Sequence, residues 1–289
     1  MADQIISIEE IHSESAADAA VEVHIQPGGY LLELSLDWLV LRASQNVHRL
    51  LDRSHVAVIG EPLGEFVQAQ ALHDLRNLFS RLSGTTGIAR AYGVRLTDET
   101  GLFDIAFQVS DGRVILEAAP SSGKGFGEAF GTIGGLISGL GESEGQALLD
   151  GGVRRMRALT GYDRVTLVCG KKRAESSRGS FASPCDFSQE CPAIFTDNDA
   201  DPVAIFPRQP DETSVHSALM RSPTPEALES LRGQGIQATL RVAFDSDGET
   251  GEFRCECRTR REPNLEVHAA AELFAQTFAL RLAMDRLKS

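Results

Sequence analysis

The chain has 289 residues, of which 42% are hydrophobic and 24% charged, as is typical of a soluble globular protein of two domains. Its 41 acidic and 28 basic residues give a net charge of −13, which argues against a nucleic-acid-binding or membrane-surface protein. No apolar run is long enough to span a bilayer, and the acidic start lacks the pattern of a signal peptide. We therefore expect a cytoplasmic protein with no nucleic-acid or membrane partner.

The first half of the chain predicts an arm and one domain. Residues 1–20 are polar and predict an arm with little structure of its own. Residues 21–120 predict a compact α+β domain, with helices and antiparallel strands in alternation. Its expected elements are strand segments between 21 and 41, helices over 46–51 and 67–82, and strands over 88–96, 102–110 and 113–118.

A glycine-rich stretch, residues 121–145, separates this domain from the rest. Lys124 stands between glycines there, but Gly125 follows it where a phosphate-binding loop requires Ser or Thr. We interpret the stretch as a flexible linker leading into a helix.

Residues 146–289 predict a second domain. A helix over 146–159 and a strand over 164–168 precede an irregular, proline-rich region. Within that region the short apolar pieces 193–195 and 203–206 predict edge strands or loop anchors. All 5 cysteines lie in this half, and their odd number and uneven spacing do not resemble a disulfide framework.

The stretch 223–257 predicts a helix followed by a hairpin. Thr224 is placed to cap the helix and Pro225 suits its first position, while the Asp- and Gly-rich residues 245–251 predict the connection between two strands. Both strands alternate strictly, so one face is apolar and the other is charged. The charged face is either solvated or forms the floor of a pocket.

The chain ends in a predicted helix that starts after Asn264. Its apolar residues recur at helical spacing and either pack on the second domain or continue as a dimer seam. These residues are Val267, Ala271, Phe274, Phe278 and Leu282.

Several short motifs, in order along the chain, resemble bacterial phytochromes. The PAS domain of that family is similar to IQPGGYLL (25–32), LRASQN (41–46), GEPL (60–63), GLFD (101–104) and SDGRVILE (110–117). Its GAF domain is similar to LTGYDRV (159–165), RSP (221–223), LRGQGI (231–236) and AELFAQ (271–276).

The resemblance implies a PAS domain followed by a GAF domain, each an antiparallel sheet flanked by helices, in a member that lacks the downstream PHY domain. Such cores hold a linear tetrapyrrole, biliverdin in the bacterial members, in the GAF pocket. They often thread the N-terminal arm through a loop of the GAF domain.

The residues that the family needs for its chromophore are mostly absent. No cysteine precedes Cys169, and the family's Cys-His pair in the GAF helix corresponds to Glu226 and Ala227, so neither family thioether can form. A second pocket histidine corresponds to Glu256. By resemblance, the residues left for a degenerate bilin pocket are Arg221, which matches a propionate partner, Asp186 and Thr239.

Three charged residues of the hairpin point toward that site by the family's orientation: Arg241, Arg254 and Glu256. Arg241 is far larger than its counterparts and would fill space that the chromophore needs. Because buried charges require partners, we expect Arg241 or Arg254 to pair with Glu256 and close the pocket.

The sequence thus predicts a phytochrome-like signalling protein without a catalytic role or a cofactor, which binds a regulatory or signalling protein and dimerises through its C-terminal helix. One alternative is a red/far-red photoreceptor that binds biliverdin without a covalent link, or through a link to Cys185 or Cys191. Another is a zinc or redox site in which Cys255 and Cys257 converge with Cys185 and Cys191. No histidine lies in an evident nucleophile–base arrangement.

Overall fold

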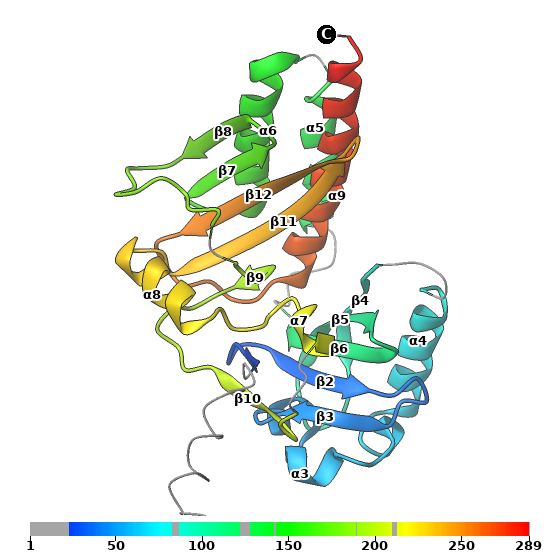
Figure 1. Cartoon of the computed structure of the whole chain (residues 1–289). Coiled ribbons are helices and arrows are strands. Elements are labelled where there is room, and N and C mark those ends of the chain that lie inside the picture. The colour runs from blue at the N-terminus through cyan, green and yellow to red at the C-terminus, as the bar shows by residue number, and fades with distance from the viewer. Residues whose placement is uncertain are drawn as a thin grey trace, which may run out of the picture.

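The computed structural model describes residues 23–82, 87–121, 128–141, 143–188, 190–209 and 213–288. Two antiparallel sheets, each with helices packed on one face, form two domains that lie one above the other (Figure 1). The expected α+β class is confirmed. The predictions for the arm and for Lys124 lie outside the described residues.

The first sheet has the strand order β1-β10-β3-β2-β6-β5-β4. Helices on one of its faces enclose an apolar core that includes Trp38, Phe103 and Phe107. The strands are β1 (His24–Ile25), β2 (Tyr30–Leu34), β3 (Val40–Ser44), β4 (Ala89–Arg95), β5 (Leu102–Ser110), β6 (Arg113–Pro120) and β10 (Val203–Phe206). The helical elements are α2 (His48–Leu51), α3 (His55–Val58), the 3-10 turn η1 (Leu63–Glu65) and α4 (Ala69–Ser80).

Strand β10 departs from the domain boundaries that the sequence predicts. It comes from the range 146–289, yet it pairs with β1 and β3 of the first sheet (Figure 1). The N-terminal segment 24–26 lies between β10 and residues 220–222, two parts of one loop. The Gln26 backbone N–H donates to Met220 O (3.1 Å), and the Ser222 N–H donates to His24 O (2.7 Å).

The second sheet has the order β8-β7-β12-β11-β9. Its strands are β7 (Arg164–Cys169), β8 (Lys172–Ser177), β9 (Ile194–Phe195), β11 (Ala238–Ser246) and β12 (Glu249–Cys257). The helices of this half are α5 (Glu128–Ser138), α6 (Gly145–Thr160), α7 (Thr213–His216), α8 (Pro225–Gly233) and α9 (Leu265–Arg286). Strand β8 and the short helix α7 were not predicted from the sequence.

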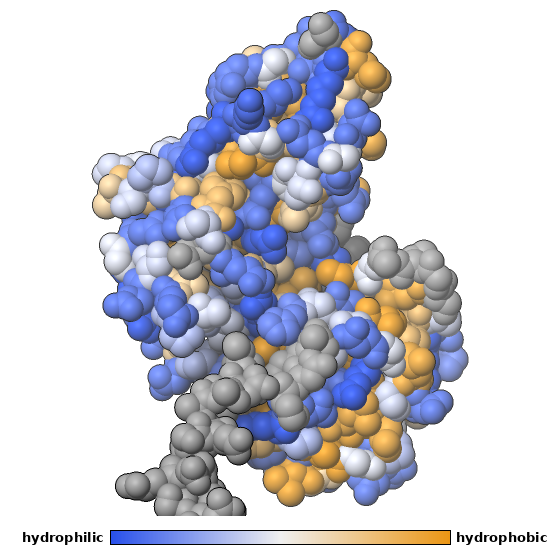
Figure 2. Space-filling model, in the orientation of Figure 1, coloured by the Kyte–Doolittle hydropathy of each residue, from blue (hydrophilic) through white to orange (hydrophobic). Residues whose placement is uncertain are grey.

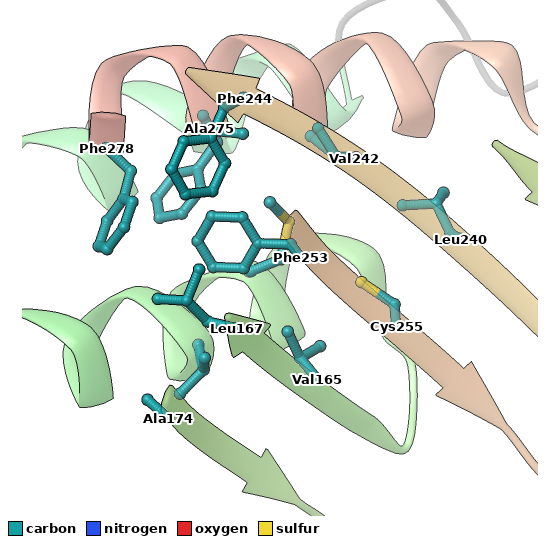
Figure 3. Packing of buried hydrophobic residues seen from close by; sticks show 14 of the residues in the cluster. Val165, Leu167, Ala174, Leu240, Val242, Phe244, Phe253, Cys255, Ala275 and Phe278 are labelled. Carbon is teal, nitrogen blue, oxygen red and sulfur yellow. The ribbon is translucent and has the colours of Figure 1, made fainter. Parts of the chain in front are cut away.

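The main core of this domain lies between the second sheet and helices α5, α6 and α9. Figure 3 shows Phe244 and Phe253 of the hairpin facing Phe278 of α9, with Leu167 of β7 beneath them. The Phe253 and Phe278 ring centroids are 5.2 Å apart in an edge-to-face arrangement. The predicted apolar stripe of α9 is buried here, apart from the half-buried Val267.

The helix caps follow the sequence signals. Thr224 accepts a hydrogen bond from the Ala227 N–H (3.3 Å), and Asn264 accepts one from the Val267 N–H (2.8 Å). Gly161 ends α6 in the left-handed conformation, as expected.

Two expected loops are shorter than predicted. Asp247 and Gly248, at φ of 57° and 77°, make a two-residue turn between β11 and β12, while Ser246 and Glu249 already pair. The ladder therefore extends through most of the expected connection 245–251. The range 121–145 also contains α5, whose Ile133 is buried in the core, so part of the expected linker is a packed helix.

No helix among the described residues is both long and apolar enough to cross a membrane.

Candidate functional site

The candidate site is the face of the second sheet that points away from α5, α6 and α9. Because side chains alternate along a strand, the strands that send Phe253 and Cys255 into the core send their neighbours to this face. The charged face predicted from the sequence therefore exists. It carries Arg164, Thr166, Glu175, Thr239, Arg241, Glu252, Arg254 and Glu256.

At one end of the β7–β12 ladder, Glu256 pairs on this face with Arg164, its direct neighbour on β7. Both side chains are 2% exposed. The Arg164 Nη1 also donates to Ser183 O (2.5 Å), and its guanidinium lies 4.1 Å from the centroid of the Phe181 ring. Such a buried ion pair is held by the additional hydrogen bond and the aromatic contact as well as by its own charges.

A second ion-pair group shares one carboxylate. Glu252 accepts from Arg241 Nε (2.8 Å) through one oxygen and from Arg254 Nε (2.9 Å) through the other. Arg241 and Arg254 lie directly opposite each other on adjacent strands, and their like charges would repel without this carboxylate. The Arg254 guanidinium also donates to Asp186 O and lies 4.6 Å from the Phe187 ring centroid.

The segment 181–187 therefore lies over the polar face of the sheet. Its carbonyl groups accept from arginines of the sheet, including a bond from Arg173 Nη2 to Cys185 O (3.2 Å). Its two phenylalanine rings lie against arginine guanidinium groups.

These charges share one face and are largely buried, as predicted, but the predicted pairing of Arg241 or Arg254 with Glu256 is wrong. Arg254 and Glu256 are buried, at 3% and 2% exposure, and Arg241 is half-buried. However, Glu256 pairs with Arg164, which the sequence analysis did not consider, and Arg241 and Arg254 both pair with Glu252. The alternation of residues 164–168 placed Arg164 on this face and could have identified it.

The three residues predicted to hold a bilin are in different environments. Arg221 is buried and was predicted to pair with a bilin propionate. In the structure it pairs with the carboxylate of Glu190, which belongs to this chain. The Asp186 carboxylate accepts hydrogen bonds from the backbone and side chain of Ser188, and these bonds hold the pKa of Asp186 below its usual value. Thr239 is fully buried, and its Oγ1 has no hydrogen-bond partner among the described residues.

The cysteines do not form a common site. Cys255 and Cys257 face the helices and belong to the apolar core. Cys185 and Cys191 lie on the other side of the sheet, beside the charges of Arg254 and Glu256. The expected convergence of four thiolates is thus wrong, and the described residues hold no group of three or more potential His, Cys, Asp or Glu ligands.

Burial also makes the thiols of the site unreactive. It raises the pKa of both Cys185 and Cys191 above the ordinary cysteine value, so neither is a thiolate near neutral pH. A covalent link to a vinyl group requires the thiolate.

Comparison with known proteins identifies the fold. The family described as PAS fold matches residues 17–121, whereas no curated protein matches the chain. The chromophore-binding domain of the *Stigmatella aurantiaca* bacteriophytochrome is 24% identical, with a TM-score of 0.73 over 90% of this chain and 95% of that one. The chromophore-binding domain of an unusual bacteriophytochrome from R. palustris is 21% identical, with a TM-score of 0.74 over 92% of this chain and 96% of that one.

A longer structure gives the same result. The photosensory core module of the *Stigmatella aurantiaca* phytochrome is 23% identical, with a TM-score of 0.75 over 92% of this chain and 59% of that one. Together with the PAS match, these likenesses bear out the resemblance drawn from the short motifs. The chain has the fold of a bacteriophytochrome chromophore-binding domain, and its residues 17–121 match the family described as PAS fold.

Proposed function

We propose that the chain is a phytochrome-like sensory or regulatory module that has lost covalent bilin attachment and acts by binding a signalling protein in the cytoplasm. The observation that carries this proposal is the buried Arg164–Glu256 pair, covered by the segment 181–187. Arginine, glutamate and phenylalanine side chains occupy the face on which a bilin would lie. The module needs no catalytic residue for such a role.

The residues present do not fit a covalently bound bilin. No cysteine precedes Cys169, and Ala227 stands buried where the family has a histidine. The family's propionate partner, Arg221, already pairs with Glu190. Opening the site would break the Arg164–Glu256 ion pair and the two ion pairs that Glu252 forms with Arg241 and Arg254.

A second candidate function is non-covalent binding of biliverdin as a photoreceptor. One observation favours it: the Thr239 Oγ1 is buried without a hydrogen-bond partner, and such groups commonly mark a missing water or ligand. The similar solved structures are chromophore-binding domains, which also favours this candidate.

Mixing the purified protein with biliverdin separates the two candidates. We expect the absorption spectrum to match that of free biliverdin before and after red light, because the ion pairs leave no room on the sheet. The measurement is an absorption titration, followed by denaturation to test for retained colour on the protein.

The matched control is Arg221→Ala. A sharpened far-red band that photoconverts in the natural chain and weakens in this variant would overturn the closed site and establish the photoreceptor. A band that is equal in both proteins would indicate biliverdin bound elsewhere on the surface.

We further propose that two copies associate through α9. The helix buries one side in its own domain and exposes Leu273, Leu280, Met284 and Leu287, at 42%, 69%, 57% and 86%. These four residues recur at spacings of seven, four and three, as in a coiled-coil seam. Figure 2 shows apolar surface along the edge of the second domain where α9 runs.

Replacing Leu280 by glutamate is expected to raise the Kd of this dimer by about 100-fold, because the two-fold axis places two charges in one apolar seam. Light scattering coupled to size-exclusion chromatography measures the change. Leu36→Glu, at another exposed apolar position (55%), which lies in the first domain, is expected to leave the Kd unchanged. A monomeric natural chain, or an unchanged dimer in Leu280→Glu, would contradict the seam.

A further inference from the structure

Figure 1 shows β9 and β11 beside the start of α9, and a small cavity lies between these elements. Its floor is made by Ile194 of β9 and Leu240 of β11, which are direct neighbours in the sheet and are each 2% exposed. Leu240 points toward the helices, whereas Thr239 and Arg241 beside it point to the polar face. The cavity has a volume of about 190 Å³. Sites for drug-sized ligands have about 300–1,000 Å³, so the occupant of this one is smaller.

A buried tyrosine at this cavity has no hydrogen-bond partner. Tyr162, which precedes β7, lines the cavity and is 5% exposed. Its hydroxyl forms no hydrogen bond with any described residue. Burial raises the pKa of Tyr162, so the hydroxyl keeps its proton and remains a donor. Because buried polar groups are normally paired, a buried donor that borders a cavity without a partner indicates a missing acceptor.

An arginine without an acidic partner stands at the same cavity. The Arg261 guanidinium lies 4.6 Å from the centroid of the Tyr162 ring. Its Nη1 donates to Gly161 O (3.0 Å) and its Nη2 to Thr160 O (2.9 Å). No carboxylate of the described residues forms an ion pair with it. A guanidinium has more N–H groups than these two bonds use, so Arg261 retains both its charge and donors for a ligand.

The start of α9 supplies a third donor and a favourable dipole. Asn264 caps the helix through its Oδ1, and the Nδ2 of the same side chain has no hydrogen-bond partner in the part of the chain that the structure describes. The helix is 22 residues long, and its N-terminal end carries a partial positive charge. Glu262 is the single carboxylate among the described lining residues, and it is exposed. The cavity therefore favours one negative charge on a ligand and disfavours a second.

We propose that this cavity binds a small monocarboxylic acid. Tyr162, Arg261 and Asn264 donate to its carboxylate, and its hydrocarbon end rests on Ile194 and Leu240. A carboxylate accepts several hydrogen bonds at once, and such bonds are stronger than those between neutral groups. The apolar floor favours an acid with a hydrocarbon end over an inorganic anion. Because the cavity lies on the face of the sheet opposite to the candidate site, the proposal does not depend on the function proposed above.

Titration of the full chain with propionate, followed by NMR at the Leu265 and Val267 amides, tests the site. We expect saturable shifts with a Kd of about 1 mM, since so small a ligand makes few contacts. Propanol has a similar size without the charge, and sulfate has no apolar part. Both are expected to bind at least about tenfold more weakly. The absence of saturable shifts with propionate, or equal binding of propanol or sulfate, would overturn the proposal.

Two variants separate binding from stability. Tyr162→Phe is expected to raise the Kd for propionate about tenfold and to leave the urea midpoint of the ligand-free protein unchanged, because the hydroxyl has no partner to lose. Tyr30→Phe, at a tyrosine of the first domain that is 6% exposed, is the matched control and is expected to keep the Kd. Glu262→Gln removes the negative charge at the cavity and is expected to lower the Kd about threefold. An unchanged Kd in Tyr162→Phe, a lower urea midpoint in that variant, or a Kd that does not fall in Glu262→Gln would contradict the site.

Discussion

Replacing Arg164 by alanine is expected to lower the free energy of unfolding by about 3–5 kcal/mol. The substitution leaves Glu256 charged and without its partner at 2% exposure. It also removes the donor to Ser183 O and one of the two guanidinium groups over Phe181, so the segment 181–187 is held less firmly at that end. Urea unfolding followed by fluorescence or circular dichroism measures the loss.

A double replacement distinguishes the ion pair from simple loss of volume. Arg164→Met combined with Glu256→Leu removes both charges and keeps apolar bulk, so we expect it to recover most of the loss. The exposed pair of Arg53 with Asp52 provides the matched control, since both side chains are more than half exposed. Arg53→Ala is expected to change stability by less than about 1 kcal/mol. If Arg164→Ala lowers the free energy of unfolding as little as Arg53→Ala does, the Arg164–Glu256 ion pair does not keep the polar face of the sheet closed.

The sequence predicted the faces of the hairpin but not the partners of its charges. Alternation in residues 238–257 is a local property, and it correctly assigned Arg241, Arg254 and Glu256 to one face. Which charge meets which depends on the register between β12 and β7, strands that lie far apart in the chain. That register puts Arg164 beside Glu256, and no local pattern encodes it.

The same distinction explains the misplaced strand. Residues 203–206 are apolar enough to predict a strand, and they form β10. Their place in the first sheet is set by pairing with β1 on one side and β3 on the other, strands that come more than half the chain length earlier. Only the family resemblance, in whose members the N-terminal arm often passes through a loop of the GAF domain, indicated contacts between the two halves of the chain.

The resemblance predicted Thr239 and Arg221 as site residues but not the contacts that they make. Thr239 Oγ1 has no hydrogen-bond partner among the described residues, and Arg221 forms an ion pair within the chain. Both residues were predicted as remnants of a bilin pocket, and both are buried. Thr239 lies on the polar face of the second sheet, and Arg221 lies in the loop beside the N-terminal segment 24–26. The resemblance could not show that Glu190 of this chain would pair with Arg221. Glu190 has no motif around it, and only the fold of the chain brings it close to Arg221.

Replacing Gln26 by alanine is expected to lower the free energy of unfolding by about 3–5 kcal/mol and to separate the unfolding of the two domains. Its Oε1 accepts from the Thr196 N–H (2.7 Å) and Oγ1 (2.8 Å), while its Nε2 donates to Ile194 O (2.5 Å) and approaches Met220 O and Arg221 O. Alanine would leave these buried groups without partners where the N-terminal segment crosses the loop.

We expect the two domains to unfold separately because the hydrogen-bond partners of Gln26 lie in the other domain. Ile194 belongs to β9 of the second sheet, whereas Gln26 directly follows β1 of the first. The side chain thus joins the two sheets, and thermal unfolding of the natural chain should show one transition that becomes two in Gln26→Ala. Gln70→Ala is the matched control, because Gln70 is exposed and bonds only Asp74 on its own helix. A single transition in Gln26→Ala, shifted no more than in Gln70→Ala, would mean that the apolar contacts of Leu219, Met220 and Leu265 couple the domains without it.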